Sequence, residues 1–176
     1  MNPEHLHPTN DFSRTPNTGG GVFIILPVLN EIANIRPLLD QIGVQLEGVP
    51  FTVGIVDDGS TDGTLEYLRD RIERPDPHLH LICRKKTLRA SQRGSALRVL
   101  MLWGLENTRH DIFIEMDGDL SHRPEELPDG IGLIARRECD VAIASKYVGG
   151  SAVTNRPWVI RSDSPIKWKL SSIRTL

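Results

Sequence analysis

The stretch FTVGIVDDGSTDGT, residues 51–64, decides the fold that we expect for this chain of 176 residues. Its first six residues are mostly apolar and favour a β-strand. The DDGSTDG that follows is rich in turn-forming residues, and Thr61 or Asp62 is the expected N-terminal cap of a helix. One apolar helical face comes next, formed by Leu65, Leu68 and Ile72. The stretch therefore predicts a strand–turn–helix unit.

A second unit of the same kind lies upstream. Residues 22–26, VFIIL, form a continuous apolar run, as expected for a strand buried on both faces, and Pro27 ends it. A helical stripe follows, made up of Ile32, Ile35, Leu38 or Leu39, Ile42 and Leu46. Asn30 or Asn34 can cap this helix. Because Pro37 is tolerated only near the first turn, we expect Asn34 to be the cap.

The alternation continues downstream. Three further strands are predicted at LHLICR (79–84), DIFIEMD (111–117) and DVAIAS (140–145). Two further helices are predicted at SALRVLMLWGLENT (95–108) and RPEELPDGIGLIARR (123–137). Strands that alternate with helices favour a mostly parallel sheet covered on both sides. We therefore expect a single α/β domain over residues 21–150. Residues 1–20 are rich in Pro, Asn, Thr and Gly and predict a disordered tail, and residues 151–176 predict irregular structure.

The composition narrows the class of protein. The chain is 39% hydrophobic and 25% charged, with a formal net charge of −2, which argues against a surface for nucleic acid. Its two cysteines, Cys83 and Cys139, are expected to stay reduced in the cytoplasm. No run approaches the roughly 20 apolar residues that span a bilayer, and the N-terminus lacks the apolar stretch of a signal peptide. We expect a cytoplasmic protein, either free in the cytoplasm or located at the cytoplasmic face of a membrane.

Polar clusters follow four of the predicted strands. They are PVLNE (27–31), DDGS (57–60), DGD (117–119) and SKY (145–147). Sheets of this kind bind ligands at the carboxyl ends of their strands. The four clusters therefore predict a ligand site at one edge of the sheet.

The two acids of the DGD cluster favour a metal ion. Asp117 and Asp119 are two residues apart in extended chain, so both side chains point to the same side. They repel each other unless a cation lies near them. Mg²⁺ is usually bound by one or two carboxylates with substrate phosphates, and Mn²⁺ suits the same ligands. The alternative is a loop whose acids are solvated or cap the next helix. His122 is a candidate ligand or acid/base group.

The other clusters favour a nucleotide. Asp57 or Asp58 can accept hydrogen bonds from a ribose or a base; the alternative is a turn that caps a helix. No G-x-G-x-x-G fingerprint is present, which argues against a nicotinamide cofactor, and no Walker A lysine motif is present either. Arg93, beside Gly94 at a helix start, is the expected phosphate contact of the basic loop 84–93. The alternative for that loop is a solvated run of charge.

Four motifs together resemble a known family. LPVLNE (26–31), IVDDGSTDGT (55–64), MDGDLSHRPEELP (116–128) and ASKYVGG (144–150) resemble the family-2 inverting glycosyltransferases of the GT-A fold. The nearest subgroup is dolichol-phosphate mannose synthase and its bacterial polyprenyl-phosphate relatives. The resemblance covers about residues 22–165 and implies that residues 21–150 form the nucleotide-sugar-binding domain, with 151–176 part of a truncated acceptor-side region.

The resemblance implies a role for each matching residue. The base and ribose of the donor would contact Pro27, Leu29, Glu31, Val56 and Asp58, with Leu29 in place of the usual tyrosine. Asp117, Gly118 and Asp119 would hold the Mg²⁺ or Mn²⁺ and the diphosphate, with glycine in place of the usual alanine. Lys146 replaces an arginine of the family, and Arg161 resembles a later arginine that faces phosphate. Asp119, Lys146 and Arg161 are the predicted catalytic residues: Asp119 would act through the metal ion, and the cations Lys146 and Arg161 would neutralise a diphosphate leaving group.

The implied reaction is a single displacement. The oxygen of a lipid phosphate attacks the anomeric carbon of a nucleotide-diphosphate sugar, GDP-mannose in the nearest subgroup, and yields a β-linked product. Membrane contact is implied, either directly at the membrane periphery or through a membrane partner subunit. Two alternatives stay open: a transferase that uses a UDP-sugar for polysaccharide synthesis, and a non-catalytic nucleotide-binding remnant, because family members continue beyond the position of Leu176.

Overall fold

The computed structural model describes residues 21–74, 76, 78–84, 93–145 and 167–171. The chain divides into two compact units. The first spans Gly19–Glu125, and the second includes Glu126–Leu176.

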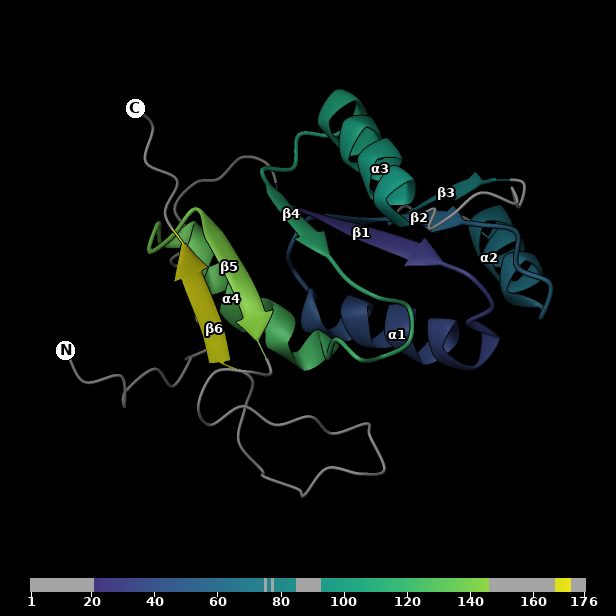
Figure 1. Ribbon diagram of the computed structural model, residues 1–176, viewed down its shortest axis with the longest axis horizontal. Helices are drawn as coiled ribbons and strands as arrows, with labels where there is room; N and C mark the ends of the chain where they lie inside the picture. The colour runs from purple at the N-terminus through teal and green to yellow at the C-terminus, as the bar shows by residue number, and fades with distance from the viewer. Residues whose placement is uncertain (1–20, 75, 77, 85–92, 146–166, 172–176) are drawn as a thin grey trace, which may run out of the picture. The chain divides into compact units, whose positions relative to one another are not determined.

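The first unit contains a four-stranded sheet. Its strands are β1 (Val22–Val28), β2 (Phe51–Asp57), β3 (Leu79–Cys83) and β4 (Ile112–Glu115). They lie in the order β3-β2-β1-β4, and every neighbouring pair is parallel (Figure 1). The predicted parallel sheet is confirmed. Because the strands are parallel, their carboxyl ends all lie at one edge, which is where such sheets bind ligands.

Helices cover both faces of this sheet. They are α1 (Ile32–Gln45), α2 (Thr64–Glu73) and α3 (Arg93–Asn107). Figure 1 shows α3 on one face and α1 on the opposite face. Because side chains alternate along a strand, the apolar run of β1 supplies a buried surface to both helices. This is why β1 is apolar throughout instead of alternating with polar residues.

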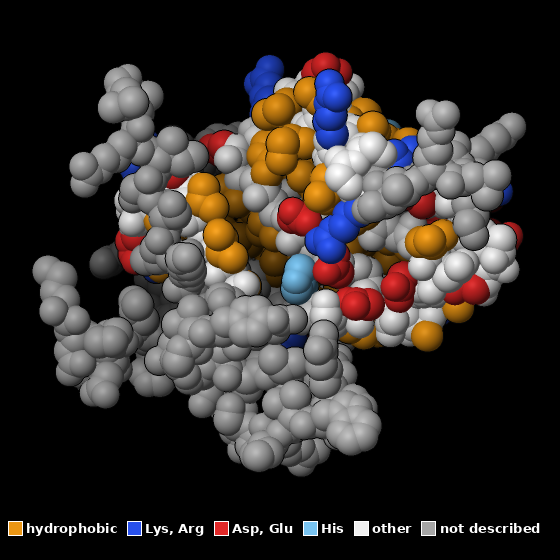
Figure 2. Space-filling model, viewed as in Figure 1, with side chains coloured by type: hydrophobic (Ala, Val, Ile, Leu, Met, Phe, Trp, Pro, Cys, Tyr) orange, Lys and Arg blue, Asp and Glu red, His pale blue; other side chains and the backbone are white. Residues whose placement is uncertain are grey.

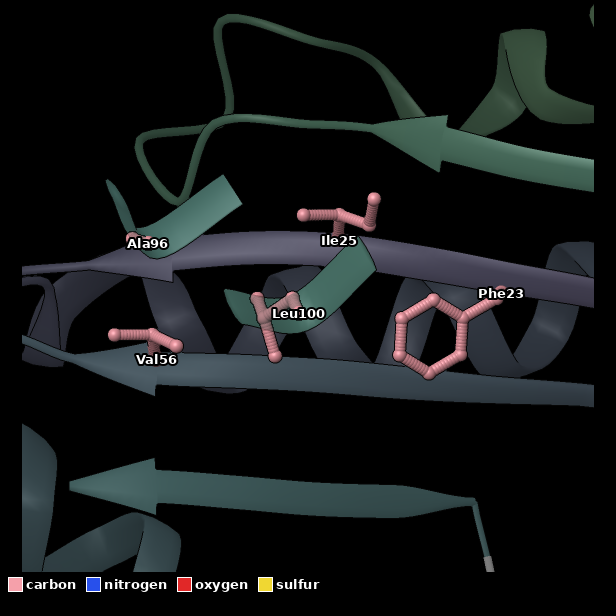
Figure 3. Packing of buried hydrophobic residues seen from close by; sticks show 5 residues of the cluster. All are labelled: Phe23, Ile25, Val56, Ala96 and Leu100. Atoms are coloured by element: carbon pink, nitrogen blue, oxygen red, sulfur yellow. The ribbon is translucent and has the colours of Figure 1, made fainter. Parts of the chain in front are cut away.

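The core beneath α3 is closely packed. Phe23 and Ile25 of β1, Val56 of β2, and Ala96 and Leu100 of α3 form a buried cluster (Figure 3). The Phe23 ring lies against two glycines, Gly54 in β2 and Gly104 in α3. A Cβ atom added to either glycine would come within 3 Å of the ring. Small residues at both positions let α3 approach the sheet.

The second unit contains a helix and a two-stranded sheet. Its helix α4 (Leu127–Ala135) follows a short 3₁₀ helix, η2 (Pro124–Glu126), so the helix predicted from residue 123 begins later. Pro128 falls in the first turn of α4, where its missing N–H is tolerated. The predicted fifth strand is present as β5 (Val141–Ser145), but it pairs antiparallel with β6 (Lys167–Ser171) in a separate sheet.

Strand β6 lies inside the segment 151–176, for which the sequence pattern predicts no element. The sequence KWKLS does alternate polar and apolar residues, which is the signal of a half-buried strand. The predicted domain boundaries themselves stay predictions. Within the part of the chain that the structure describes, no helix has both the length and the apolar character that a membrane crossing requires.

Candidate active site

The loops that follow β1 and β2 are joined by hydrogen bonds at the carboxyl edge of the sheet. The Asn30 N–H donates to Ser60 Oγ at 2.8 Å, and the Thr61 N–H donates to Asn30 Oδ1 at 2.8 Å. The Glu31 N–H donates to Thr64 Oγ1 at 2.9 Å. Asn30 adopts a positive φ of 57°, a conformation that asparagine tolerates better than most residues. The loops after β1 and β2 are therefore held together as one hydrogen-bonded structure.

This structure fixes the start of α1, which differs from the prediction. The helix begins at Ile32 with Glu31 in the N-cap position, and Asn34 lies inside the first turn. The Ile32 N–H donates to Asp62 Oδ2 at 3.1 Å, and the Asn34 side chain donates to Glu31 Oε2 at 2.8 Å. The prediction of Asn34 as the cap was wrong because the acceptor comes from the loop after β2. Pro37 lies inside this helix and beyond its first turn, so the expectation that placed the cap at Asn34 was wrong on this point as well.

The start of α2 also differs. Its N-cap is Gly63, which has a φ of 100°, and not Thr61 or Asp62. Asp62 lies one residue earlier, and its Oδ1 accepts hydrogen bonds from the Thr64 N–H at 3.0 Å and the Thr64 hydroxyl at 2.6 Å. The hydroxyl bond is the main reason that the pKa of Asp62 is lowered. One carboxylate thus satisfies the first N–H of both α1 and α2.

The two acids after β2 have different surroundings. Asp57 is fully buried, and its Oδ1 accepts hydrogen bonds from the N–H groups of Gly59 and Ser60, both at 3.0 Å. Its Oδ2 has no hydrogen-bond partner among the described residues. Asp58 forms a two-pronged ion pair with Arg84, with 2.6 Å from Nε to Oδ1 and 2.8 Å from Nη2 to Oδ2. Asp57 therefore holds the turn, and Asp58 is held by a strand-end arginine.

The acids after β4 lie in a tight turn at residues 118–119 and not in the extended chain that was expected for them, so the prediction that both side chains point to one side because of strand alternation was wrong. The Asp117 N–H donates to His122 Nδ1 at 3.1 Å, and the Ser121 N–H donates to Asp119 Oδ1 at 2.9 Å. Leu120 between them has a φ of 60°. Nε2 of the same imidazole lies 4.0 Å from Asp117 Oδ2, which is beyond hydrogen-bond distance. His122 therefore closes the turn through the backbone of Asp117.

Charged groups surround this turn. Arg93 Nη2 lies 2.7 Å from Glu115 Oε1 and 2.9 Å from Asp117 Oδ1, and the hydrogen bond to Glu115 is the main reason that the pKa of Arg93 is raised. Partial burial opposes ionisation of Asp119, but hydrogen bonds with Ser121 and with its own backbone, together with the nearby His122, lower its pKa on balance. Acidic and basic side chains and a histidine lie together on the face shown in Figure 2.

The turn after β4 packs against the loop after β1. A Cβ added at Gly118 would lie 3.3 Å from Glu31 Cγ and 3.5 Å from Val28 Cγ2. This contact brings two of the predicted donor-binding motifs together. An alanine, the residue expected from the resemblance, fits if Glu31 moves by a few tenths of an ångström.

The remaining predicted residues are distributed as follows. Pro27 is half-buried near the end of β1, and Leu29 is 45% exposed in the loop that follows. The Val56 side chain is buried in the core, so a ligand there would meet its backbone. Lys146 and Arg161 lie outside the described residues.

Sequence reasoning missed Glu115 and the partner of Asp58. Glu115 is the acid that interrupts the apolar strand IFIEM two residues before Asp117, which places both on the same side of the chain. This spacing was the available signal. The pairing of Asp58 with Arg84 joins residues 26 apart, and no local pattern predicts it.

Comparison with known proteins identifies the family. The model of glycosyl transferase family 2 matches residues 23–175. This chain belongs to glycosyl transferase family 2. The predicted resemblance is thereby confirmed.

Relatives of this family 2 chain include transferases named for lipid phosphates. This chain is 32% identical over 137 residues to a dolichol-phosphate mannosyltransferase from Pyrococcus furiosus. That match covers 78% of this chain and 36% of the relative. This chain is 36% identical over 137 residues to an undecaprenyl-phosphate mannosyltransferase from Micrococcus luteus, which covers 77% of this chain and 52% of the relative. The chain thus spans about a third to a half of the length of these relatives.

A solved structure supports the GT-A fold of this family 2 chain. A mannosyltransferase from Pyrobaculum calidifontis in complex with GDP-Man and Mn²⁺ has a TM-score of 0.52 and 27% identity. The match covers 71% of this chain and 35% of that one. The predicted fold class, a mostly parallel α/β sheet of the GT-A type, is confirmed.

In this family 2 chain, Asp117 and Asp119 are the candidate ligands for a metal ion. Among the described residues, no group of three or more His, Cys, Asp and Glu side chains is placed to hold a metal ion by itself. A divalent ion of the Mg²⁺ type commonly takes only one or two carboxylates and completes its shell with substrate phosphates and water. Asp117 and Asp119 supply that number of carboxylates at the ligand-binding edge.

Proposed function

We propose that this chain transfers a sugar from a nucleotide-diphosphate donor to a dolichyl or polyprenyl phosphate, with inversion, and that the donor is GDP-mannose. The observation that carries the proposal is the contact of Gly118 with Glu31, which unites the Asp117–Asp119 turn with the loop after β1 at the carboxyl edge of a parallel sheet. Such edges bind nucleotides. The names of the relatives support the donor and the acceptor class.

In this proposal different loops bind different parts of the donor. Pro27, Leu29 and Glu31 contact the base and ribose, together with Asp58 and the backbone at Val56. Asp117 and Asp119 would hold Mg²⁺ or Mn²⁺, and together with Gly118 they would hold the diphosphate. When bound, the metal ion supplies positive charge that stabilises the leaving diphosphate.

The proposed chemistry needs no strong base. The acceptor is a lipid phosphate, which is already ionised at neutral pH, so its oxygen can attack the anomeric carbon directly. The new C–O bond forms as the bond to the diphosphate breaks, and the nucleoside diphosphate leaves with the electron pair. Arg93, Lys146 and Arg161 would counter its charge. Because the acceptor is a membrane lipid, we also propose contact with the cytoplasmic face of a membrane, directly or through a partner subunit.

Calorimetric titration with GDP-mannose and with UDP-glucose, each with and without Mn²⁺, tests the donor and the metal together. We expect GDP-mannose to bind only with Mn²⁺, and Asp119→Ala to abolish that binding. Asp111→Ala is the matched control, because Asp111 is exposed and precedes β4 at the opposite end of the strand. The control should bind like the wild type.

The outcomes separate the alternatives. Metal-dependent binding of UDP-glucose instead of GDP-mannose favours the UDP-sugar transferase. Donor binding by well-folded protein that transfers no sugar to a polyprenyl phosphate favours the non-catalytic remnant. If no nucleotide sugar binds in the presence of Mn²⁺, the proposal is wrong.

A further inference from the structure

The Arg93 guanidinium holds two carboxylates at the end of β4. Its Nη2 lies 2.7 Å from Glu115 Oε1 and 2.9 Å from Asp117 Oδ1. Glu115 ends β4 and Asp117 follows two residues later, so the two side chains leave the chain on the same side. A cation that belongs to the protein therefore already pairs with one of the two carboxylates proposed to hold the metal.

The contact between Arg93 and Asp117 is easily broken. Their side chains are 49% and 29% exposed, and ion pairs with this degree of exposure are weak. A guanidinium carries five N–H donors, whereas both carboxylate contacts use Nη2. Arg93 can therefore release Asp117 and turn toward another anion while Glu115 retains it.

Charge determines when this release is favourable. Glu115, Asp117 and Asp119 carry three formal negative charges, and Arg93 carries one positive charge. A divalent cation that binds Asp117 comes close to the guanidinium and is repelled by it. A diphosphate attracts both cations, so its arrival removes the conflict between them.

We propose that Arg93 is an exchangeable counter-ion of the metal site. It neutralises Asp117 when no donor is bound, and it moves to the diphosphate when a divalent cation takes Asp117. The inference rests on the proposed function and deepens it. It predicts that divalent cations and nucleoside diphosphates bind cooperatively. A diphosphate draws Arg93 away from Asp117 and so removes the repulsion between Arg93 and the divalent cation. A divalent cation displaces Arg93 from Asp117 and so removes the ion pair that keeps Arg93 from the diphosphate. Arg93 is then a positioning residue that couples the two ligands.

Titration calorimetry on the whole chain, with Mn²⁺ alone, GDP alone, and GDP with Mn²⁺, tests the proposal. Arg93→Gln should bind Mn²⁺ alone up to about fivefold more tightly than the wild type, the factor that corresponds to an exposed ion pair. The gain in GDP affinity on adding Mn²⁺ should fall by a similar factor. Arg98→Gln is the control, because it removes an exposed arginine from the same helix and should match the wild type.

A second variant separates charge from geometry. Arg93→Lys keeps the positive charge but lacks the planar fork, so it should bind Mn²⁺ alone like the wild type while the gain in GDP affinity decreases. Thermal unfolding of each variant verifies that it is folded.

The possible results discriminate between the two proposals. Equal Mn²⁺ affinity in the wild type and Arg93→Gln, or no Mn²⁺ binding to either, overturns the counter-ion role without reference to any nucleotide. Wild-type protein that binds Mn²⁺ but not GDP overturns the proposed function, and with it the movement of Arg93 to a diphosphate. In that case a tighter Mn²⁺ affinity of Arg93→Gln still identifies Arg93 as the counter-ion of Asp117.

Discussion

The ion pair between Asp58 and Arg84 allows a quantitative test of the structure. The two hydrogen bonds are 2.6 and 2.8 Å long, and the side chains are only 13% and 19% exposed. A hydrogen bond to a charged group is worth about 1.5–3 kcal/mol, and breaking a fully buried pair costs about 3–5 kcal/mol. Because this pair retains some contact with water, we predict a coupling free energy of about 2 kcal/mol.

A double-mutant cycle measures this coupling. Asp58→Asn, Arg84→Met and the double variant are compared with the wild type by denaturant unfolding, and methionine keeps most of the apolar stem of arginine. Arg84 also donates to Ser95 Oγ at 2.6 Å. Arg84→Met removes this hydrogen bond whether or not Asp58 is replaced, so its contribution cancels in the cycle. For a chain of this size, a loss of about 2 kcal/mol lowers the melting temperature by roughly 4–8 °C.

The double variant shows directly whether the two side chains interact. It should be less destabilised than the sum of the two single variants, because each single variant leaves one charge buried without its partner. A coupling free energy below about 0.5 kcal/mol, the level at which independent sites add, would refute the ion pair. Asp58 would then be available to a nucleotide without first losing a partner.

Two further predictions concern the folding of the first unit. Leu100→Ala should lower the free energy of unfolding by about 3 kcal/mol, because Leu100 is fully buried beneath α3. Leu102→Ala on the same helix, where Leu102 is 46% exposed, should change it by less than about 0.5 kcal/mol, and equal losses in denaturant unfolding would contradict the packing. Asp62→Asn should reduce the loss of stability on acidification below about pH 4. The pKa of Asp62 is lowered in the folded protein, chiefly by Thr64, so its stabilisation is present above its unfolded pKa and is lost as pH falls through its folded pKa. Identical profiles of stability against pH for the wild type and Asp62→Asn would contradict this.

The amino-acid sequence by itself indicated strands β1–β5 and the approximate positions of the helices, but not strand β6 or the residues at which the helices begin. The apolar run of β1 and the stripes of the helices are local periodicities, and they follow from which faces must be buried. The placement of Asp117 and Asp119 directly after β4 was also predictable, because a parallel sheet brings its strand ends to one edge. The roles of Lys146 and Arg161 remain predictions.

Only the tertiary structure decided which polar groups pair. Asn30 and Asp62 fix the starts of helices through partners some 30 residues away, and Arg84 reaches Asp58 across 26 residues. β5 pairs with β6, which lies beyond a long intervening segment. Hydrophobic periodicity is a property of neighbouring residues, so a sequence displays it directly. A hydrogen bond or ion pair depends on where two distant segments meet, and that is set only when the apolar faces have packed.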